Sequence, residues 1–393
     1  ITDTAVVMEL RDKHLAKAVA DPTNDIAEAQ KAIRWHFALR DATMRKVEKA
    51  RLAAEPKHLA ALQAFAARAW RRPLTAAERA NLVTYYKTLR AKNQLSHEDA
   101  VRDSLVAVLM SPDFLYRMDP AGARTAKASG DKVFAAQALP ANSLASRLSY
   151  FLWSSMPDAT LSRHAATGDL GQPQVLLAQT RRMLKDGRAK GLATEFTANW
   201  LGVRQFETSN SVDRERFPGF TDDLRSAMFQ EPVRFMADVI ANDRSVLDLL
   251  YGDYTFVNPA LAKHYGMPAV TGGNDNWVRV DNASRYNRGG FLPMAVFMTQ
   301  NSPGLRTSPV KRGSWVVQKV LGIRIPPPPP VVPELPNDES KSELSVRDTL
   351  AQHRANPVCA ACHARFDSFG LAFEGFGPVG ESRDKDLAGL PVD

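Results

Sequence analysis

Cysteine is almost absent from this chain of 393 residues, which contains only Cys359 and Cys362. A chain of this length can bury a sizeable hydrophobic core, so it needs no disulfide framework for stability. A disulfide between these two residues would close a very small loop and would stabilise the fold little. The pair is therefore expected to serve chemistry rather than stability.

Long apolar runs are also missing, and no segment approaches the roughly 18 to 20 apolar residues of a membrane-spanning helix. The first residues, ITDTAVVMELRDKHLAKA, carry charges throughout and do not have the pattern of a signal peptide. Because the chain lacks an initiator methionine, we expect it to begin inside a longer product. No P-loop, dinucleotide fingerprint, catalytic triad or paired-carboxylate motif is present to indicate another chemistry.

The charge balance is basic, with a net charge of +8 and an isoelectric point near 9.4. The basic residues are spread along the chain, and no zinc-finger or RNA-recognition signature is present, so no nucleic-acid partner is expected. The charge suits an acidic protein partner or an anionic surface. A solvated surface would account for it equally well.

Helical periodicity fills most of the chain, and little strand signal is found. It predicts an N-terminal helical domain over residues 1–120, a central helical domain over residues 137–268 and a C-terminal domain over residues 285–393. Segments rich in small, polar or glycine residues separate them. The hydrophobic fraction of 44% is that of an ordinary globular protein.

Several local signals mark where helices begin, bend and end. Thr75, followed by Glu78, predicts a capped helix start. Pro232 is expected to kink or split the helix that contains it. The run Pro326 to Pro330 cannot be helix or central strand, and it predicts an extended polyproline II strut. Pro357 is expected to end the preceding short helix just before the cysteines.

The cysteines lie in a Cys-x-x-Cys-His motif formed by Cys359, Cys362 and His363. This spacing is typical of covalent haem c attachment, in which two thiols bond the porphyrin and the adjacent histidine ligates the iron. A zinc site usually needs a second such pair, and a redox pair would be expected in a βαβ context. The motif therefore predicts one covalent haem c and, because thiols are joined to haem in an exported compartment, a periplasmic or cell-surface location.

The second axial ligand of the iron cannot follow the motif, because residues 364–393 contain neither Met nor His. Met294 and Met298 share one helix face, and either is slightly preferred as ligand over His353, although core packing is the ordinary role of such a pair. A ligand from another polypeptide, or an open iron position, remains an alternative.

Two further groups are candidates for contact with the haem. Arg306, Lys311 and Arg312 are cations that suit the anionic propionates, or alternatively a solvated helix start. Four phenylalanines follow the motif and are expected to pack on the porphyrin and exclude water. These residues are Phe366, Phe369, Phe373 and Phe376.

Six stretches, in this order, resemble the planctomycete-type multidomain cytochrome-c-like proteins, which are built from consecutive domains of unknown function and occur also in myxobacteria, verrucomicrobia and some proteobacteria. The stretches are AARAWRRPLTAAERA, LASRLSYFLWSSMPDATL, YTFVNPALAKHYGM, NRGGFL, RTSPVKRGSWVVQKVLGIRIPPPPPVVPELP and HRANPVCAACHARFDSFGLAFEGFGPVGESR. The resemblance covers about residues 60–393. It implies a haem and an exported compartment, and members usually carry an export signal and further domains, but the family has no well-established reaction.

We therefore predict a mainly α fold, with two helical domains followed by a C-terminal cytochrome-c-like haem module and a polyproline strut. The predicted function is electron transfer through a single haem, within a larger complex that includes a redox partner protein or a further haem domain. One alternative is a peroxidase- or oxygenase-like haem enzyme with an open iron site. Another is a docking subunit of a haem protein complex, and the sequence does not decide whether the chain is an enzyme.

Overall fold

The computed structural model describes residues 3–20, 25–117, 138–208, 211–326 and 338–392. Contacts divide the chain into an N-terminal unit, residues 1–146, and a C-terminal unit, residues 147–393. The division falls inside helix α6 (Ala141–Trp153). The fold is mainly helical, as predicted. The three predicted domain ranges are not tested by this division, and they stay a prediction.

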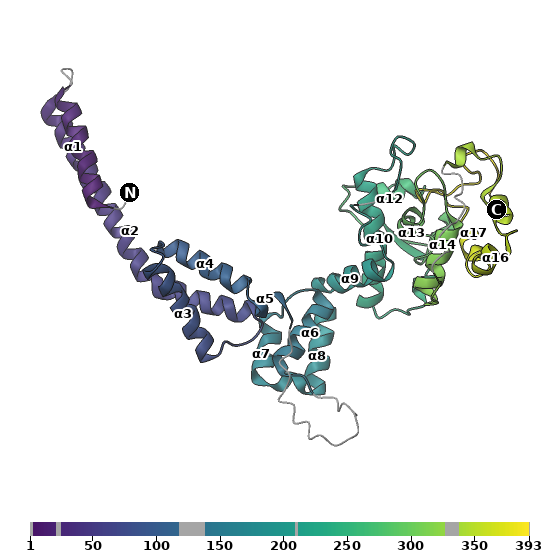
Figure 1. Cartoon of the computed structure of the whole chain (residues 1–393), viewed down its shortest axis with the longest axis horizontal. Coiled ribbons are helices and arrows are strands. Elements are labelled where there is room, and N and C mark those ends of the chain that lie inside the picture. The colour runs from purple at the N-terminus through teal and green to yellow at the C-terminus, as the bar shows by residue number, and fades with distance from the viewer. Residues whose placement is uncertain (1–2, 21–24, 118–137, 209–210, 327–337, 393) are drawn as a thin grey trace. The chain divides into compact units, whose positions relative to one another are not determined.

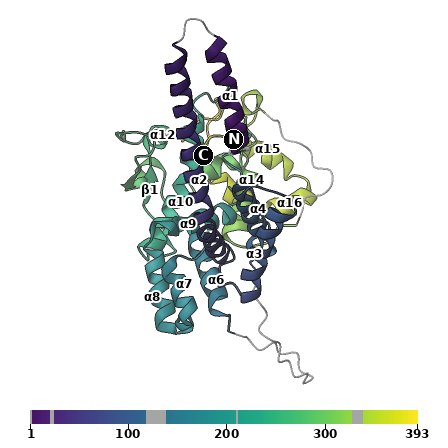
Figure 2. The same cartoon turned by 90° about the vertical axis from the view of Figure 1, so that its left-hand side faces the viewer.

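The N-terminal unit is built from helices alone in its described part. Its elements before α6 are α1 (Thr4–Ala20), α2 (Ile26–Ala69), α3 (Ala76–Ala91), α4 (His97–Leu109) and α5 (Pro112–Leu115). Helix α1 packs side by side with the first part of α2, as both views show (Figures 1 and 2). The end of α2 packs against α3 and α4 around Leu62, Ala66 and Leu82.

Side chains cap most of these helices. Asp25 accepts hydrogen bonds from the first turn of α2. At the start of α3, Thr75 Oγ1 accepts from the Glu78 N–H, and the Glu78 carboxylate accepts from the Thr75 N–H. This reciprocal pair confirms the predicted capping box. Ser96 Oγ caps α4 by accepting from the Asp99 N–H, so the unit begins its helices where its local sequence indicates.

The C-terminal unit contains shorter elements. Its helices are α7 (Ala159–Thr167), α8 (Pro173–Leu184), α9 (Lys190–Trp200), α10 (Asp222–Ala241), α11 (Asp248–Tyr251), α12 (Pro259–His264), α13 (Ala295–Gln300), α14 (Pro309–Trp315), α15 (Val346–His353), α16 (Pro357–His363) and α17 (Asp367–Leu371). The 3-10 helices are η1 (Asp169–Gly171), η2 (Gly187–Ala189), η3 (Ala283–Tyr286) and η5 (Glu339–Lys341), and η4 (Val316–Val320) is a π-helix.

The strands β1 (Tyr254–Val257) and β2 (Val278–Asp281) form a small antiparallel sheet in this unit. Tyr254 pairs with Asp281 and Val257 with Val278. A two-stranded sheet is marginal by itself and needs packing against other elements. Here β1 packs on α10, and the ring of Phe235 stacks on that of Tyr254 at 4.6 Å.

One hydrophobic core joins the middle of this unit to its C-terminal part. It includes side chains from α9, α10, β1, α12, α13 and α14, together with Val379 near the end of the chain. Helix α10 runs through Pro232 without a break, so the expected split does not occur. The missing N–H is outweighed because Pro232 and the residues around it are buried in this core.

Helices α14 and α17 approach each other through glycine, and Figure 1 shows them side by side. A Cβ on Gly370 would lie 1.8 Å from the Pro309 carbonyl oxygen, and one on Gly313 would lie 2.0 Å from that of Phe366. Only glycine permits this backbone contact. It fixes α17, which follows the Cys-x-x-Cys-His motif, against α14.

Two further sequence predictions concern a membrane-spanning helix and the polyproline strut. No helix in the described ranges combines the length and the apolar character needed to span a bilayer. The predicted polyproline strut lies at residues 326–330, of which 327–330 are outside the described residues.

Candidate functional site

The Cys-x-x-Cys-His motif forms helix α16, which begins at Pro357 and ends at His363. Helix α15 ends before the cysteines as predicted, but at His353, and Pro357 opens α16 instead of ending α15. The Asn356 carbonyl accepts the first hydrogen bonds of α16, from the N–H groups of Cys359 and Ala360. Because Cys359 and Cys362 are three residues apart on a helix, both thiols lie on one side of α16. Both are half-buried and free.

His363 is held by a carboxylate. Its Nδ1 lies 2.9 Å from Oδ1 and 3.1 Å from Oδ2 of Asp367, the first residue of α17. Asp367 is 1% exposed, and its Oδ2 also lies 3.6 Å from Nε of the Arg354 guanidinium. An acceptor on Nδ1 fixes the tautomer in which Nε2 keeps its lone pair. The arrangement therefore leaves the lone pair of His363 on Nε2, the atom that a metal ion would need.

His353 and Phe366 lie directly beside His363. The ring centroid of His353 is 4.8 Å from that of His363, with the planes at 62°. Phe366 is buried, and its ring lies 5.2 Å from the His363 ring. The structure thus brings together three residues that the sequence selected for separate reasons.

The two candidate methionines have a different environment. Met294 precedes α13 and Met298 lies within it, and they are 1% and 0% exposed in the main hydrophobic core. Their neighbour Phe297 packs on Trp315 at 4.2 Å and on Phe373 at 5.4 Å. Both methionines therefore fill the core, and ligation would require their sulfur atoms to leave it.

The three predicted cations at α14, Arg306, Lys311 and Arg312, differ in their environment, although α14 itself packs against α17. Arg312 is 0% exposed, and its guanidinium donates to the carbonyl oxygens of Phe373, Phe376 and Gly377 at 2.8 Å. Burial lowers the pKa of Arg312 to about 10, which is still high enough to keep its charge at neutral pH. Because these carbonyls occupy both terminal nitrogens and only Nε has no partner, the structure gives Arg312 a structural role rather than the expected one at a propionate.

Arg306 and Lys311 remain open to such a role. Lys311 is exposed, and its backbone N–H donates to Ser308 Oγ. Arg306 is half-buried and donates to the Thr307 carbonyl, while its Nε has no partner. Burial lowers the pKa of Arg306.

The remaining three phenylalanines differ in their exposure to solvent. Phe373 packs on Phe297 as a core residue, and Phe376 lies under the Arg288 guanidinium, 4.8 Å from it. Phe369, on α17, is 41% exposed. An exposed aromatic ring beside α16 is available to a bound apolar group, whereas Phe373 and Phe376 already belong to the protein core.

The donor set fits a haem and does not fit a zinc ion. No three His, Cys, Asp or Glu side chains within the described residues are gathered to hold a metal ion. Two free thiols on one helix side, followed by a histidine with a fixed tautomer and an exposed ring at Phe369, are the groups that a covalently attached porphyrin requires.

Asp367 is the site residue that sequence reasoning missed. A carboxylate four residues after a ligating histidine is close enough to reach its ring, so the spacing His-x-x-x-Asp was a usable signal. Arg354 was also not selected, and it carried no signal of its own before α15, α16 and α17 were placed.

Three protein-family models match the chain in succession. PSD5, a protein of unknown function (DUF1595), matches residues 59–119. PSD4, a protein of unknown function (DUF1592), matches residues 139–267, and PSCyt3, a protein of unknown function (DUF1588), matches residues 288–386. The chain has the planctomycete-type cytochrome-c-like multidomain architecture. The predicted family is thereby confirmed.

The Cys-x-x-Cys-His motif lies inside the PSCyt3 match, whose name hints at a cytochrome-like domain. No curated protein and no solved structure shows significant similarity to the chain. The family therefore supports a cytochrome-like region at the end of the chain and leaves its reaction open.

Proposed function

We propose that this chain is an exported c-type cytochrome that carries one covalent haem on α16 and transfers electrons within a larger redox complex. The observation that carries the proposal is the helix α16 itself. It holds two free thiols on one side and ends in a histidine whose Nδ1 is occupied by Asp367. Haem supplies one-electron oxidation and reduction when bound.

Cys359 and Cys362 would form the two thioether bonds, and His363 would ligate the iron through Nε2. Asp367 orients the His363 ring by accepting a hydrogen bond from its Nδ1–H, and this bond makes the imidazole a more basic ligand. Arg354, 3.6 Å from the carboxylate, offsets part of the negative charge that would otherwise be buried there.

For the second axial ligand we favour His353 over Met294 and Met298. His353 is half-buried close to the motif, although its ring would have to turn away from His363 to admit the porphyrin between them, whereas both methionines are packed in the core. This reverses the slight preference for methionine that the sequence suggested. For the propionates we retain Arg306 and Lys311 and not Arg312, because Arg312 is fully buried and both of its terminal nitrogens donate to backbone carbonyls.

The partner is proposed to be a redox protein or a further haem domain with an acidic surface. The net charge of +8 would favour such a partner by long-range attraction. The region outside the haem module is large, which suits a docking role alongside electron transfer. The proposed location is the periplasm or the cell surface, where covalent haem attachment takes place.

The test is to produce the full chain by export in a host that attaches haem c, and to extract it with acid-acetone. We expect the haem to stay with the protein, and to be lost from the double variant Cys359→Ala, Cys362→Ala. Haem that leaves the unsubstituted protein, or protein that takes up none, would overturn the proposal.

The ferrous visible spectrum then tests the ligands. His363→Ala is expected to change the coordination of the iron, and His353→Ala to open its sixth position. His164→Ala is the matched control, because His164 is another half-buried histidine whose Nδ1 lies 3.0 Å from an aspartate, Asp169, but it is far from the motif in sequence. A five-coordinate unsubstituted protein that binds carbon monoxide readily would favour the alternative of a haem enzyme.

A further inference from the structure

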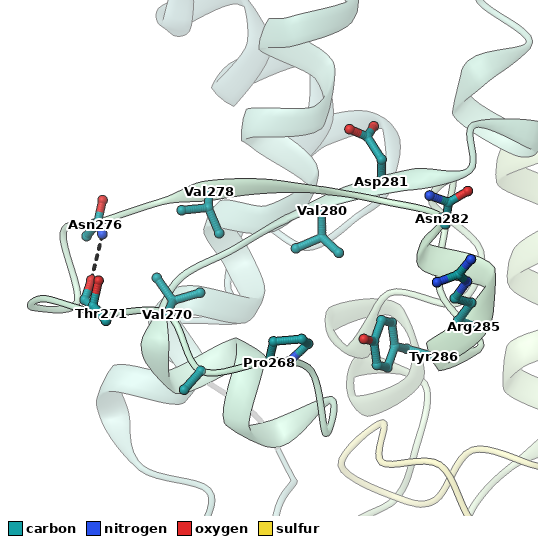
Figure 3. Close-up of a pocket in the computed structure, with 11 residues that line it drawn as sticks. Pro268, Val270, Thr271, Asn276, Val278, Val280, Asp281, Asn282, Arg285 and Tyr286 are labelled. Atoms are coloured by element: carbon teal, nitrogen blue, oxygen red, sulfur yellow. Dashed lines mark hydrogen bonds between the residues drawn. The ribbon is translucent and has the colours of Figure 1, made fainter.

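A second site, separate from α16, lies beside the small sheet of the C-terminal unit. A cavity of about 420 Å³ is lined by residues between Pro268 and Tyr286. Figure 3 shows β2 as one wall and the segment around Pro268 and Val270 as the other. A volume of this size is in the range of pockets that hold small organic molecules. The segment lies between the PSD4 match, which ends at residue 267, and the PSCyt3 match, which begins at residue 288.

The walls of this pocket are apolar. Side chains alternate along a strand, so Val278 and Val280 share the face of β2 that is turned to the cavity. Val270 lies opposite them, and the ring of Tyr286 closes one end (Figure 3). These four side chains are only partly buried against the main core. A ligand with an apolar body would cover their remaining exposed surface.

The pocket is held open by hydrogen bonds in the loop that borders it. Asn276 Nδ2 donates to the Thr271 carbonyl at 2.6 Å, which Figure 3 marks. Asn258 Nδ2 donates to the Asn274 carbonyl at 3.0 Å, and Asn274 Nδ2 donates to Asp223 at 2.9 Å. Since these bonds anchor the loop to α10 and α12, the walls are formed before any ligand arrives.

A cation stands at the end that Tyr286 closes. Arg285 is exposed on η3, and in the described part of the chain neither an acidic side chain nor a hydrogen-bond acceptor engages its guanidinium. The preceding acid, Asp281, is paired with Arg279 at 2.9 Å, and its side chain leaves β2 on the side away from Val280 (Figure 3). The local charge at this end is therefore positive.

We propose that this pocket binds a small organic carboxylate with an apolar body, its carboxylate on Arg285 and its body between Val270 and the valines of β2. A guanidinium forms a two-bond pair with a carboxylate, which fixes the orientation of the ligand. The apolar walls select against sugars and other fully polar molecules, because such ligands would lose water without gaining partners. The site is independent of the haem on α16.

The test uses the full chain and two probes of equal size, 3-phenylpropionate and its neutral amide, in ligand-observed NMR titrations. We expect the acid to bind roughly three- to tenfold more tightly than the amide, as one charge-assisted pair at a half-open site implies. Arg285→Gln should reduce the affinity for the acid to that of the amide and leave the amide unchanged. Val280→Asp should weaken both probes.

Lys263→Gln is the matched control, because Lys263 is an exposed cation on the neighbouring helix α12 that does not line the pocket. It should leave both affinities unchanged. Equal affinity for acid and amide, an affinity for the acid that survives Arg285→Gln, or no binding of either probe at millimolar concentration would each overturn the proposal. Arg285 is on the surface, so its variant should fold normally, and the circular dichroism spectrum checks this.

Discussion

The two units differ in where they place charged side chains. Among the described residues of the N-terminal unit no Arg, Lys, Asp or Glu side chain is buried, and Glu78 caps a helix together with Thr75. In the C-terminal unit charged groups are buried, and Arg383 pairs with Glu339 at 2.8 Å and with Glu374 at 3.0 Å while it is only 7% exposed. When an exposed polar side chain is removed, water can bind its former partner. When a buried one is removed, its partner is left without a hydrogen bond, which costs more stability. The difference predicts where substitutions will be severe.

The largest effect is expected at Arg312. Arg312→Met would remove the guanidinium donor from three backbone carbonyls and one of the two cations near the buried Glu374, the other being Arg383. Breaking such a site destabilises a protein by about 3 to 5 kcal/mol. Urea unfolding, with hydrogen exchange of peptides from α14 and α17, measures the change.

The adjacent variant Lys311→Met is its control, because Lys311 is exposed and should cost less than about 0.5 kcal/mol. Arg312→Lys keeps the charge but loses the planar guanidinium, so its loss of stability should lie between those of Arg312→Met and Lys311→Met. If Arg312→Met and Lys311→Met had equal effects, the contrast between buried and exposed polar groups would be wrong.

A second test concerns the buried Glu231 and the half-buried His264, which respond to pH in opposite directions. Burial raises the pKa of Glu231 from 4.5 to about 7, and burial lowers the pKa of His264 from 6.5 to about 4. Glu231 is protonated in the native state while the unfolded chain is ionised, so its contribution to stability falls as pH rises from 4.5 to 7. His264 is neutral in the native state while the unfolded chain is protonated, so its contribution is lost as pH falls from 6.5 to 4.

Each shift corresponds to roughly 3 kcal/mol, and the two cancel between about pH 4.5 and 6.5. Glu231→Gln should expose the acid sensitivity caused by His264, and His264→Gln should expose the opposite slope. Urea midpoints at three pH values across this window are sufficient. Identical pH profiles for Glu231→Gln and the unsubstituted protein would show that Glu231 is not held protonated.

The third test concerns the close contact between α14 and α17. Gly370→Ala would place a Cβ 1.8 Å from the Pro309 carbonyl oxygen, so the helices must move apart. Overpacking of this kind costs about 1 to 3 kcal/mol. Gly187→Ala is the control, because a Cβ there meets no atom within 4 Å. Thermal unfolding of both variants measures the difference, and equal transition temperatures would argue against the contact.

How well the sequence predicted each region follows from the distance between interacting residues along the chain. The capping box was predictable because Thr75 and Glu78 are three residues apart. The Cys-x-x-Cys-His motif is equally local, and so is Asp367, although it was missed. The role of Arg312 was not predictable, because its partners lie more than 60 residues away, beyond the proline run.

The same reasoning explains the methionines and the pocket. The sequence predicts one helix face for Met294 and Met298, but α13 begins only after Met294, and the packed core shows that both side chains are enclosed by protein. The pocket at Val278 and Val280 depends on the register of β2 against β1, and the sequence carries little strand signal. Features that depend on neighbouring residues could therefore be predicted from the sequence, whereas burial by distant residues could be seen only in the folded structure.

The smallest effect is expected at the helix cap of the N-terminal unit, and it completes the comparison. Thr75→Ala removes the acceptor of the Glu78 N–H, but this N–H can then bind water, so the cost should be about 1 kcal/mol. Thr75→Ser keeps the hydroxyl and should be nearly neutral. Hydrogen exchange of peptides from α3 reports the change, and peptides from α14 and α17 should be unaffected. If Thr75→Ala destabilised the protein as much as Arg312→Met, exposure to water would not be what separates the two units.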